Sequence, residues 1–286
     1  MESQPFPVYY HPGSLLDVEV AAGSGIRQFE VVRPITPFGS GQCLVVQEKT
    51  SNHGDPDEEI ILKVYDPRFM HGRRKWMKKD WDAESEADAV EWRKTHPPPE
   101  PITSSYVSDI RYEDRSLDQE NWLFLDAYLH HSKEVRAYGE LQPLQGKGIP
   151  RFLGHGKLCS NTLQQDPATR YIEPKILLLE YIPNSMTLQD ADVSMIRPDL
   201  IRSLLDTVEK LQLYDVIHAG LHAGNFLFAP DRALVIDFGR AIFRDGYSDE
   251  DWETLFVCEG DPRGVRVYLQ QKLGIKSVDD YLKNIV

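Results

Sequence analysis

Three strand patterns follow one another near the start of the chain, and this succession constrains the fold more than any other feature. Residues 29–32 (FEVV) and 43–47 (CLVVQ) are rich in β-branched and apolar side chains, and they flank the turn-forming stretch PFGSG at 37–41. A polar, acidic loop then leads to a third strand, IILKVY at 60–65. The three strands predict an antiparallel meander.

Helical patterns dominate the rest of the chain. A charged segment at 73–94 is predicted to form a helix, which the proline cluster at 97–101 ends. Apolar residues at three- and four-residue spacing predict helices at about 118–141 and 199–213, and two more helices are predicted to start at Asp261 and Ser277. Short strands are predicted at 151–156, 176–181, 226–228 and 234–236. Strands first and helices later predict an α+β fold.

Composition narrows the function classes. A net charge of −13 over 286 residues disfavours nonspecific binding to nucleic acid or anionic membranes, because lysine and arginine hold phosphate groups. The basic run Arg73–Lys79 is a local exception, and a solvated helix face is favoured over nucleic-acid binding as its explanation. Three scattered cysteines without CxxC spacing, no secretory signal and no membrane-length apolar run predict a cytoplasmic, or nuclear, protein that is not secreted.

Three residues have the character of site residues, although each has an ordinary structural explanation. Lys63 lies in the middle of an apolar strand, where a snorkelling or outward-facing lysine is common. Glu134 lies on a predicted helix and alone would be a surface carboxylate. Asp237 directly follows a strand and precedes Phe238 and Gly239, so it either projects into a cleft or initiates a turn. Their order along the chain is more specific than any one of them.

A glycine turn, a strand lysine and a helix glutamate are followed by HAGLHAGN at 218–225 and VIDFG at 235–239. This order resembles the protein-kinase and aminoglycoside-phosphotransferase superfamily. The segments LKVYDPRF (62–69), EVRAYGEL (134–141) and LQGKGIPRFLGHG (144–156) look most like its fungal kinase-like branch. The resemblance spans roughly residues 29–239, and its specific part is the pair of HxDxxxxN-like and DFG elements.

The resemblance implies a bilobal protein-kinase-like fold. An N-lobe with an antiparallel sheet would occupy residues 1–182, with a long helical insert at about 66–133, and a short, mostly helical C-lobe would occupy 183–286. It further implies ATP and Mg²⁺ as cofactors. The residues implied to bind the nucleotide are Phe38, Gly39, Ser40, Gly41, Lys63, Glu180, Tyr181 and Ile182.

The same resemblance implies roles for charged and polar residues. Lys63 would bridge phosphates, Glu134 would orient that lysine, and Asp237 would hold magnesium with Asn225 as the second metal ligand. His218 would brace the loop at 218–225. These assignments make Lys63, Glu134 and Asp237 the catalytic set.

The chain departs from the family at the position of the catalytic aspartate, where Gly220 stands. A glycine cannot accept a proton, and a general base is worth about 10²–10⁴ in rate. His222, Asp215 and Asp245 are candidate replacements. Only 47 residues follow Gly239 and no APE-like motif is present, so a protein substrate of an ordinary protein kinase is disfavoured.

Three functions remain open. The first is a nucleotide-binding pseudokinase. The second is a weak or unconventional small-molecule phosphotransferase, or a natural enzyme whose aspartate has been replaced at position 220. The third is a kinase fold repurposed for acyl, adenylyl or aminoacyl transfer, including tRNA-dependent peptide-bond or cyclodipeptide formation. The expected partners are a small-molecule substrate or a protein bound through the insert, and tRNA only through the Arg73–Lys79 run.

Overall fold

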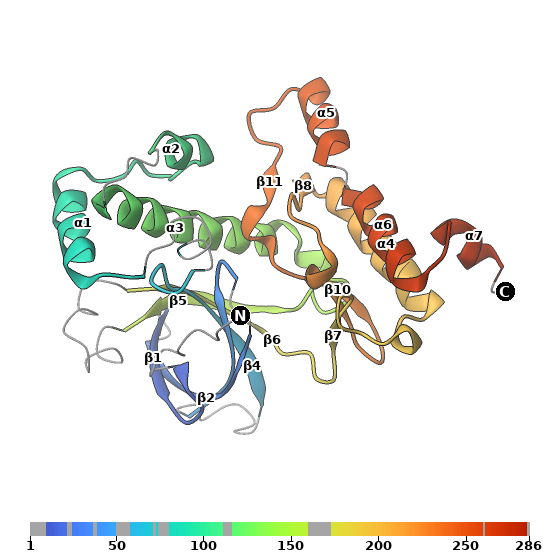
Figure 1. The fold of residues 1–286 in the computed structure, drawn as a ribbon, viewed down its shortest axis with the longest axis horizontal. Coiled ribbons are helices and arrows are strands. Elements are labelled where there is room, and N and C mark those ends of the chain that lie inside the picture. The colour runs from blue at the N-terminus through green and yellow to red at the C-terminus, as the bar shows by residue number, and fades with distance from the viewer. Residues whose placement is uncertain are drawn as a thin grey trace. The chain divides into compact units, whose positions relative to one another are not determined.

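The structure of the chain, a computed structural model, describes residues 10–21, 25–36, 39–49, 58–70, 73, 80–110, 116–159, 173–259 and 261–284. Its contacts divide the chain into two units, each described by itself (Figure 1). Unit 1 comprises Met1–Ser132 and Leu153–Tyr181. Unit 2 comprises Lys133–Phe152 and Ile182–Val286.

Six antiparallel strands of unit 1 close into a barrel. Their bounds are β1 (Leu15–Val20), β2 (Ile26–Ile35), β3 (Gln42–Glu48), β4 (Glu59–Tyr65), β5 (Phe152–Leu158) and β6 (Lys175–Glu180). The strand order is β1-β2-β3-β4-β6-β5, and the barrel closes because β1 pairs with β2 along one edge and with β5 along the other. A register shift in β2 between Val31 and Arg33 marks a bulge in its pairing with β3.

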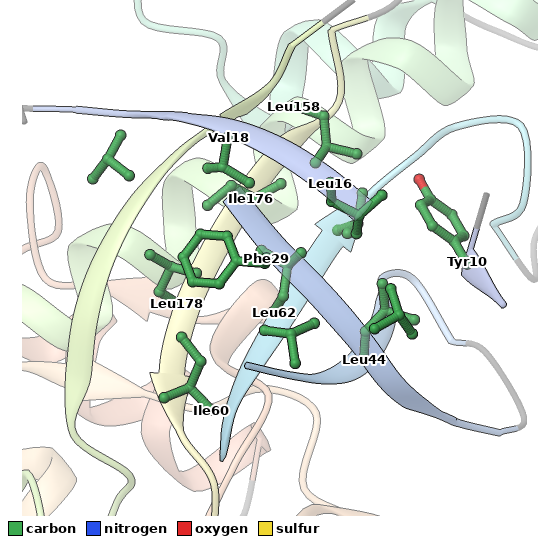
Figure 2. Packing of buried hydrophobic residues seen from close by; sticks show 14 residues of the cluster. Tyr10, Leu16, Val18, Phe29, Leu44, Ile60, Leu62, Leu158, Ile176 and Leu178 are labelled. Atoms are coloured by element: carbon green, nitrogen blue, oxygen red, sulfur yellow. The ribbon is translucent and has the colours of Figure 1, made fainter. Parts of the chain in front are cut away.

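The barrel interior is filled by alternate residues of its strands. Leu62 and Val64 of β4 are fully buried, and Leu44 of β3 and Phe29 of β2 pack in the same cluster. Figure 2 shows Phe29, Leu44 and Leu62 lying between the strands. Side chains point alternately to the two faces of a strand, so a period of two in the apolar residues is what a filled barrel requires.

The predicted fold class is wrong. A closed six-stranded barrel stands where an open antiparallel sheet of a bilobal protein-kinase-like fold was predicted. The prediction failed because residues 15–20 were not recognised as a strand, and this strand pairs Val18 with Leu158 and thereby closes the sheet. Gly156 makes the closure possible, since a Cβ at that position would lie 2.1 Å from the carbonyl oxygen of Glu19.

Three helices follow β4. They are α1 (Ala83–Thr95), α2 (Ser104–Asp109) and α3 (Ser116–Glu140). The predicted helix at 118–141 is confirmed by α3. The predicted helix at 73–94 begins later, at Ala83, where the Asp82 side chain accepts the Ser85 backbone N–H and caps the first turn. Within unit 1, Val107 of α2 packs against Leu125 and Leu129 of α3.

Unit 2 combines helices with very short strands. Its bounds are η3 (Gln142–Leu144), β7 (Met186–Thr187), η6 (Val193–Met195), α4 (Pro198–Leu213), β8 (Val216–Ile217), η7 (Ala223–Asn225), β9 (Phe226–Phe228), β10 (Ala233–Val235), η8 (Phe238–Arg240), β11 (Ile242–Phe243), α5 (Asp249–Glu259), α6 (Asp261–Leu273) and α7 (Val278–Lys283). The predicted helix at 199–213 is confirmed by α4, which contacts α6 and β10 (Figure 1). The predicted helix starts at Asp261 and Ser277 are also confirmed. Every helix in the described ranges is too short or too polar to span a lipid bilayer.

Candidate functional site

A hairpin in unit 2 brings Asn225 and Asp237 to the same end of a small sheet. Strands β9 and β10 pair antiparallel, with Phe226 opposite Val235. The pairing continues one step further, because the Ile236 N–H donates to the Asn225 carbonyl oxygen at 3.0 Å. Asn225 therefore lies beside the segment that leads directly into Asp237.

The Asn225 side chain has a defined orientation. Its Nδ2 donates a hydrogen bond of 3.0 Å to the Gly220 carbonyl oxygen, so the amide oxygen Oδ1 is the atom that remains as an acceptor. Asn225 is buried, and Asp237 adopts a left-handed backbone with φ 69°, which is uncommon for a residue with a side chain. Two oxygen-bearing side chains, one of them on a strained backbone, suit a hard cation such as Mg²⁺.

A metal site made of protein side chains alone is not present in the described part of the chain. No group of three or more His, Cys, Asp or Glu residues there has the arrangement to hold a metal ion. The Asn225 and Asp237 pair offers two ligands. Magnesium bound by one or two protein groups takes its other ligands from water and phosphate oxygens, so the pair fits a cation that arrives with a phosphate ligand.

The loop between β8 and η7 is held from two directions. The His218 imidazole donates from Nε2 to the Ile236 carbonyl oxygen at 3.0 Å, which ties the loop to the residue before Asp237. The His218 backbone N–H donates to Asp261 Oδ2 at 2.7 Å. The Ala219 N–H also bonds to this carboxylate, and Ala219 itself has a left-handed backbone with φ 53°. His218 thus braces the loop, as its predicted role requires.

Asp261 is the residue that sequence reasoning missed. It is the first residue of α6, is 4% exposed and lies 43 positions from its hydrogen-bond partner His218. Burial raises the pKa of Asp261 to about 6, although the two backbone hydrogen bonds favour its charged form. Its Asp-Pro start signals a helix, but no local pattern shows that the carboxylate will clamp a distant loop.

Gly220 stands at the position predicted for the missing base, and it lies against the Arg240 side chain. A Cβ added there would first meet Arg240 Cδ, at 3.2 Å, which is part of a flexible side chain. A pocket of about 230 Å³ opens at the same loop, and Gly220, Asp261, Gly264 and Tyr268 are among the residues that line it. The loop therefore borders a cavity at Gly220.

The candidate replacements for the base are engaged elsewhere. Asp215 pairs with Arg244 at 3.1 Å, and Asp245 pairs with Arg136. His222 Nδ1 accepts the Gly224 N–H at 3.0 Å and caps η7. These contacts give each of the three side chains a partner of its own.

In unit 1 the structure brings Lys63 next to the glycine turn. Lys63 is 5% exposed, and a Cβ on Gly41 would lie 3.0 Å from its Cε. Leu62 and Val64 face the barrel interior, so Lys63 lies on the outer face of β4, with its Nζ 5.4 Å from the centre of the Tyr65 ring. Gly39 and Ser40 lie just before Gly41, whereas Phe38 lies outside the described residues.

The remaining predicted residues are distributed over both units. Glu180 ends β6, opposite Ile60, and the Tyr181 hydroxyl accepts a hydrogen bond of 2.6 Å from Arg33 in unit 1. Ile182 packs in a buried cluster of unit 2. Glu134 is fully buried on α3, so the alternative interpretation as a surface carboxylate is wrong. The predicted residues of unit 1 are Gly39, Ser40, Gly41, Lys63, Glu180 and Tyr181, and those of unit 2 are Glu134, Ile182, Gly220, Asn225 and Asp237.

Arg73, the first residue of the basic run at 73–79, is buried and is not a surface charge. Arg73 is 3% exposed and makes two hydrogen bonds, of 2.5 and 2.6 Å, to the Glu120 carboxylate. A guanidinium that is buried and neutralised in this way cannot contact a phosphate backbone. Residues 74–79 lie outside the described residues, and tRNA binding through them stays a prediction.

Comparison with known proteins establishes no family for the chain. No protein-family model matches it, and no curated protein matches it at a significant level. The resemblance of its motifs to the kinase and aminoglycoside-phosphotransferase superfamily therefore stays a prediction.

Proposed function

We propose that the protein binds ATP together with Mg²⁺ and that it has lost the proton acceptor of an ordinary phosphotransferase. The observation that carries the proposal is the pair formed by Asn225 and Asp237. The amide of Asn225 is fixed by Gly220, and its backbone carbonyl is bonded to Ile236, the neighbour of Asp237. Two hard oxygen ligands are thereby held at one end of a hairpin.

The ligand count supports a metal that arrives with a phosphate rather than a permanent metal centre. Mg²⁺ prefers six oxygen ligands, and two protein side chains leave several positions for water and phosphate oxygens. The left-handed backbone of Asp237, with φ 69°, costs free energy that a functional role explains. The role assigned to Asn225 and Asp237 is therefore to hold the cation that neutralises a polyphosphate.

Unit 1 contributes an independent assignment. Gly41 permits close packing against the Lys63 side chain, since a Cβ there would lie 3.0 Å from Lys63 Cε. A lysine next to a glycine turn is the combination that suits phosphate oxygens, with the ammonium as a point charge and backbone N–H groups as donors.

Gly220 sets the expected chemistry. With glycine at this position and with His222, Asp215 and Asp245 held in other contacts, the loop offers no general base. Loss of a base is worth about 10²–10⁴ in rate, whereas charge neutralisation and positioning are retained. Nucleotide binding with weak or no phosphotransfer is the expected result.

The three scattered cysteines favour a cytoplasmic location for the protein.

Isothermal titration calorimetry with ATP, with and without Mg²⁺, tests the binding. The natural sequence should bind ATP more tightly with Mg²⁺, and Asp237→Asn should remove at least about 10-fold of this metal-dependent gain, as expected for a hydrogen-bonded or ligating charge. Asp231→Asn is the matched control, because Asp231 is an exposed aspartate in the turn of the same hairpin. ATP affinity that does not respond to Mg²⁺, or an equal loss in both variants, contradicts the proposal.

Turnover tests the role of position 220. A carboxylate fits there after a small movement of the Arg240 side chain, because the nearest contact of an added Cβ is 3.2 Å. Gly220→Asp should raise ATP hydrolysis by about 10²-fold or more while leaving ATP affinity within a few-fold. Gly220→Asn is the control of similar size that cannot accept a proton as a carboxylate does. Equal turnover of the two variants would show that the missing base does not limit the chemistry.

A further inference from the structure

Helix α1 is held in unit 1 by polar side chains. Its sequence, AESEADAVEWRKT, is mostly polar, and its buried residues are Glu86 and Ala89. Glu86 is 1% exposed, which is rare for a glutamate because burial penalises the charged form of a carboxyl group. Since alanine offers little apolar surface, the contacts of Glu86 decide whether α1 stays in place.

A second glutamate, Glu120 of α3, lies beside Glu86 and already has a cationic partner. Arg73 donates hydrogen bonds to both oxygens of Glu120, at 2.5 and 2.6 Å, and also donates to the Pro67 carbonyl oxygen. The Glu120 residue is 1% exposed. Its charge is therefore balanced by Arg73 without a contribution from α1.

Glu86 has one cationic partner and one oxygen without a donor. Its Oε1 accepts a hydrogen bond of 3.2 Å from Arg93, whose other terminal nitrogen donates to the Asn121 amide oxygen at 2.9 Å. The Arg93 guanidinium also lies over the Phe124 ring, 4.0 Å from its centre. The Glu86 Oε2 atom is buried and receives no hydrogen bond from any residue in the described ranges.

The neighbouring carboxylate explains this second oxygen of Glu86. The two carboxyl groups are within hydrogen-bonding reach of each other, and such a bond exists only if one of them carries a proton. Because Arg73 engages both oxygens of Glu120, the proton belongs on Oε2 of Glu86. Burial raises the pKa of Glu86, and the charge of Glu120 raises it further, whereas Arg93 lowers it.

We propose that Glu86 and Glu120 form a proton-dependent latch that docks α1 on α3. In the closed latch, protonated Glu86 donates from Oε2 to Glu120. The charged groups that face Glu86 are Arg93 on its own helix and Glu120 on α3, which is paired with Arg73. When Glu86 loses its proton, two buried carboxylates face each other with no donor between them, and α1 separates from α3 so that Glu86 reaches water.

The direction of the pH dependence follows from the proton. A group whose pKa is raised in the docked state contributes its full stabilisation at low pH, where it is protonated whether or not the helix is docked. This stabilisation is lost as the pH rises through the raised pKa of docked Glu86, so α1 loosens toward alkaline pH. A helix held by ordinary ion pairs would not loosen in this way, because carboxylates and guanidinium groups both stay charged.

Carbon-13 NMR of the full chain measures the proton directly. In a sample labelled at the glutamate Cδ and assigned sequentially, the Glu86 signal should titrate at a higher pH than glutamate signals of the same chain unfolded in urea. This measurement needs no variant, so it holds even if a substitution at position 86 prevents folding.

Hydrogen exchange of the α1 amides measures docking. After correction for intrinsic rates, exchange over residues 86–95 should accelerate at least about 5-fold between about pH 5.5 and about pH 8.5. Glu86→Gln keeps a neutral donor toward Glu120 and cannot ionise, so its exchange should change less than about 2-fold. Glu91→Gln, at an exposed position of the same helix, is the matched control and should respond as the natural sequence does.

Three results would overturn the inference. One is a Glu86 titration midpoint equal to that of the unfolded chain. Another is equal exchange of the α1 amides at the two pH values in the natural sequence. The third is the same pH response in Glu86→Gln as in the natural sequence. All measurements are made without ATP or Mg²⁺, so failure of the proposed nucleotide binding leaves this inference standing.

Discussion

Replacing Gly156 by alanine tests why the strands of unit 1 close into a barrel. A Cβ on residue 156 would lie 2.1 Å from the Glu19 carbonyl oxygen and 3.0 Å from the Glu19 carbonyl carbon and the Val20 Cα. All three are backbone atoms of β1, so no side-chain rotation relieves the contact. The strands β1 and β5 must therefore separate by about 1 Å to restore an ordinary carbon–oxygen distance.

The cost follows from the contacts along this seam. Separation strains the hydrogen bond from the Ala21 N–H to the His155 carbonyl oxygen, 2.8 Å long, and that from the Cys159 N–H to the Asp17 carbonyl oxygen, also 2.8 Å long. Each is worth about 1 kcal/mol, and overpacking of a closed core costs about 1–3 kcal/mol. We expect Gly156→Ala to lower the free energy of unfolding by about 3 kcal/mol, or the melting temperature by about 6–12 °C.

Thermal and urea unfolding followed by circular dichroism measure this loss. Gly139→Ala is the matched control, because Gly139 lies on α3 with no atom within 4 Å of an added Cβ. This variant should be neutral or gain up to about 1 kcal/mol, since alanine is the better helix former. A loss in Gly156→Ala no larger than in the control would refute the closure of the barrel through β1 and β5.

Three further predictions concern buried charges. Burial raises the pKa of Asp261 from 3.8 to about 6, so the stability linked to this group is full below pH 3.8 and is lost as the pH rises through 6. Relative to Asp261→Asn, the protein should lose about 2 kcal/mol between pH 4 and 7 in urea unfolding. Burial, followed by the charge of His155, lowers the pKa of His131 from 6.5 to about 4. The stability linked to His131 is therefore full above pH 6.5 and is lost as the pH falls through 4. An NMR titration midpoint of His131 near 6.5 would contradict this. Arg73→Met should cost about 3–5 kcal/mol because it leaves the Glu120 carboxylate buried without its partner, whereas Lys94→Met, in an exposed pair, should cost less than about 1 kcal/mol.

The sequence predicts the long helices and central strands of this protein well. The helices α3 and α4 begin and end within two residues of their predicted limits, because each carries a sustained apolar stripe at helical spacing. The strands β6, β9 and β10 are likewise predicted from short apolar runs, although their pairing is not. These elements are specified by local patterns, which are visible in a single sequence.

Features that depend on distant residues are not predicted. The strand at 15–20 carries Leu16, Val18 and Val20 at alternate positions, but its role in closing the barrel depends on its pairing with β5, more than 130 positions away. The basic run at 73–79 predicts a charged surface, but Arg73 is buried in an ion pair with Glu120, which lies 47 positions later in the chain. The order of the motifs led to a kinase-like prediction, but it carried no information on whether the sheet is open or closed into a barrel.

In the candidate site, too, some features follow from local sequence patterns and others depend on distant residues. Asn225 and Asp237 are singled out by motif spacing, and the two strands between them follow from local patterns. The clamp by Asp261, the orientation of the Asn225 amide and the pocket at Gly220 all depend on α6 or on the fold of the loop. Sequence reasoning thus selects the residues that we propose as ligands, whereas the structure supplies the contacts that hold Asn225 and its loop.

Electron paramagnetic resonance of Mn²⁺ measures whether Asn225 and Asp237 hold a divalent cation, as we propose. Mn²⁺ prefers the same oxygen ligands as Mg²⁺, and its free-ion signal is lost on binding. We expect one saturable Mn²⁺ site in the presence of ATP, weakened at least about 10-fold in Asp237→Asn and unchanged in Asp231→Asn. Equal Mn²⁺ binding by all three proteins would contradict the assignment of this pair as the metal ligands.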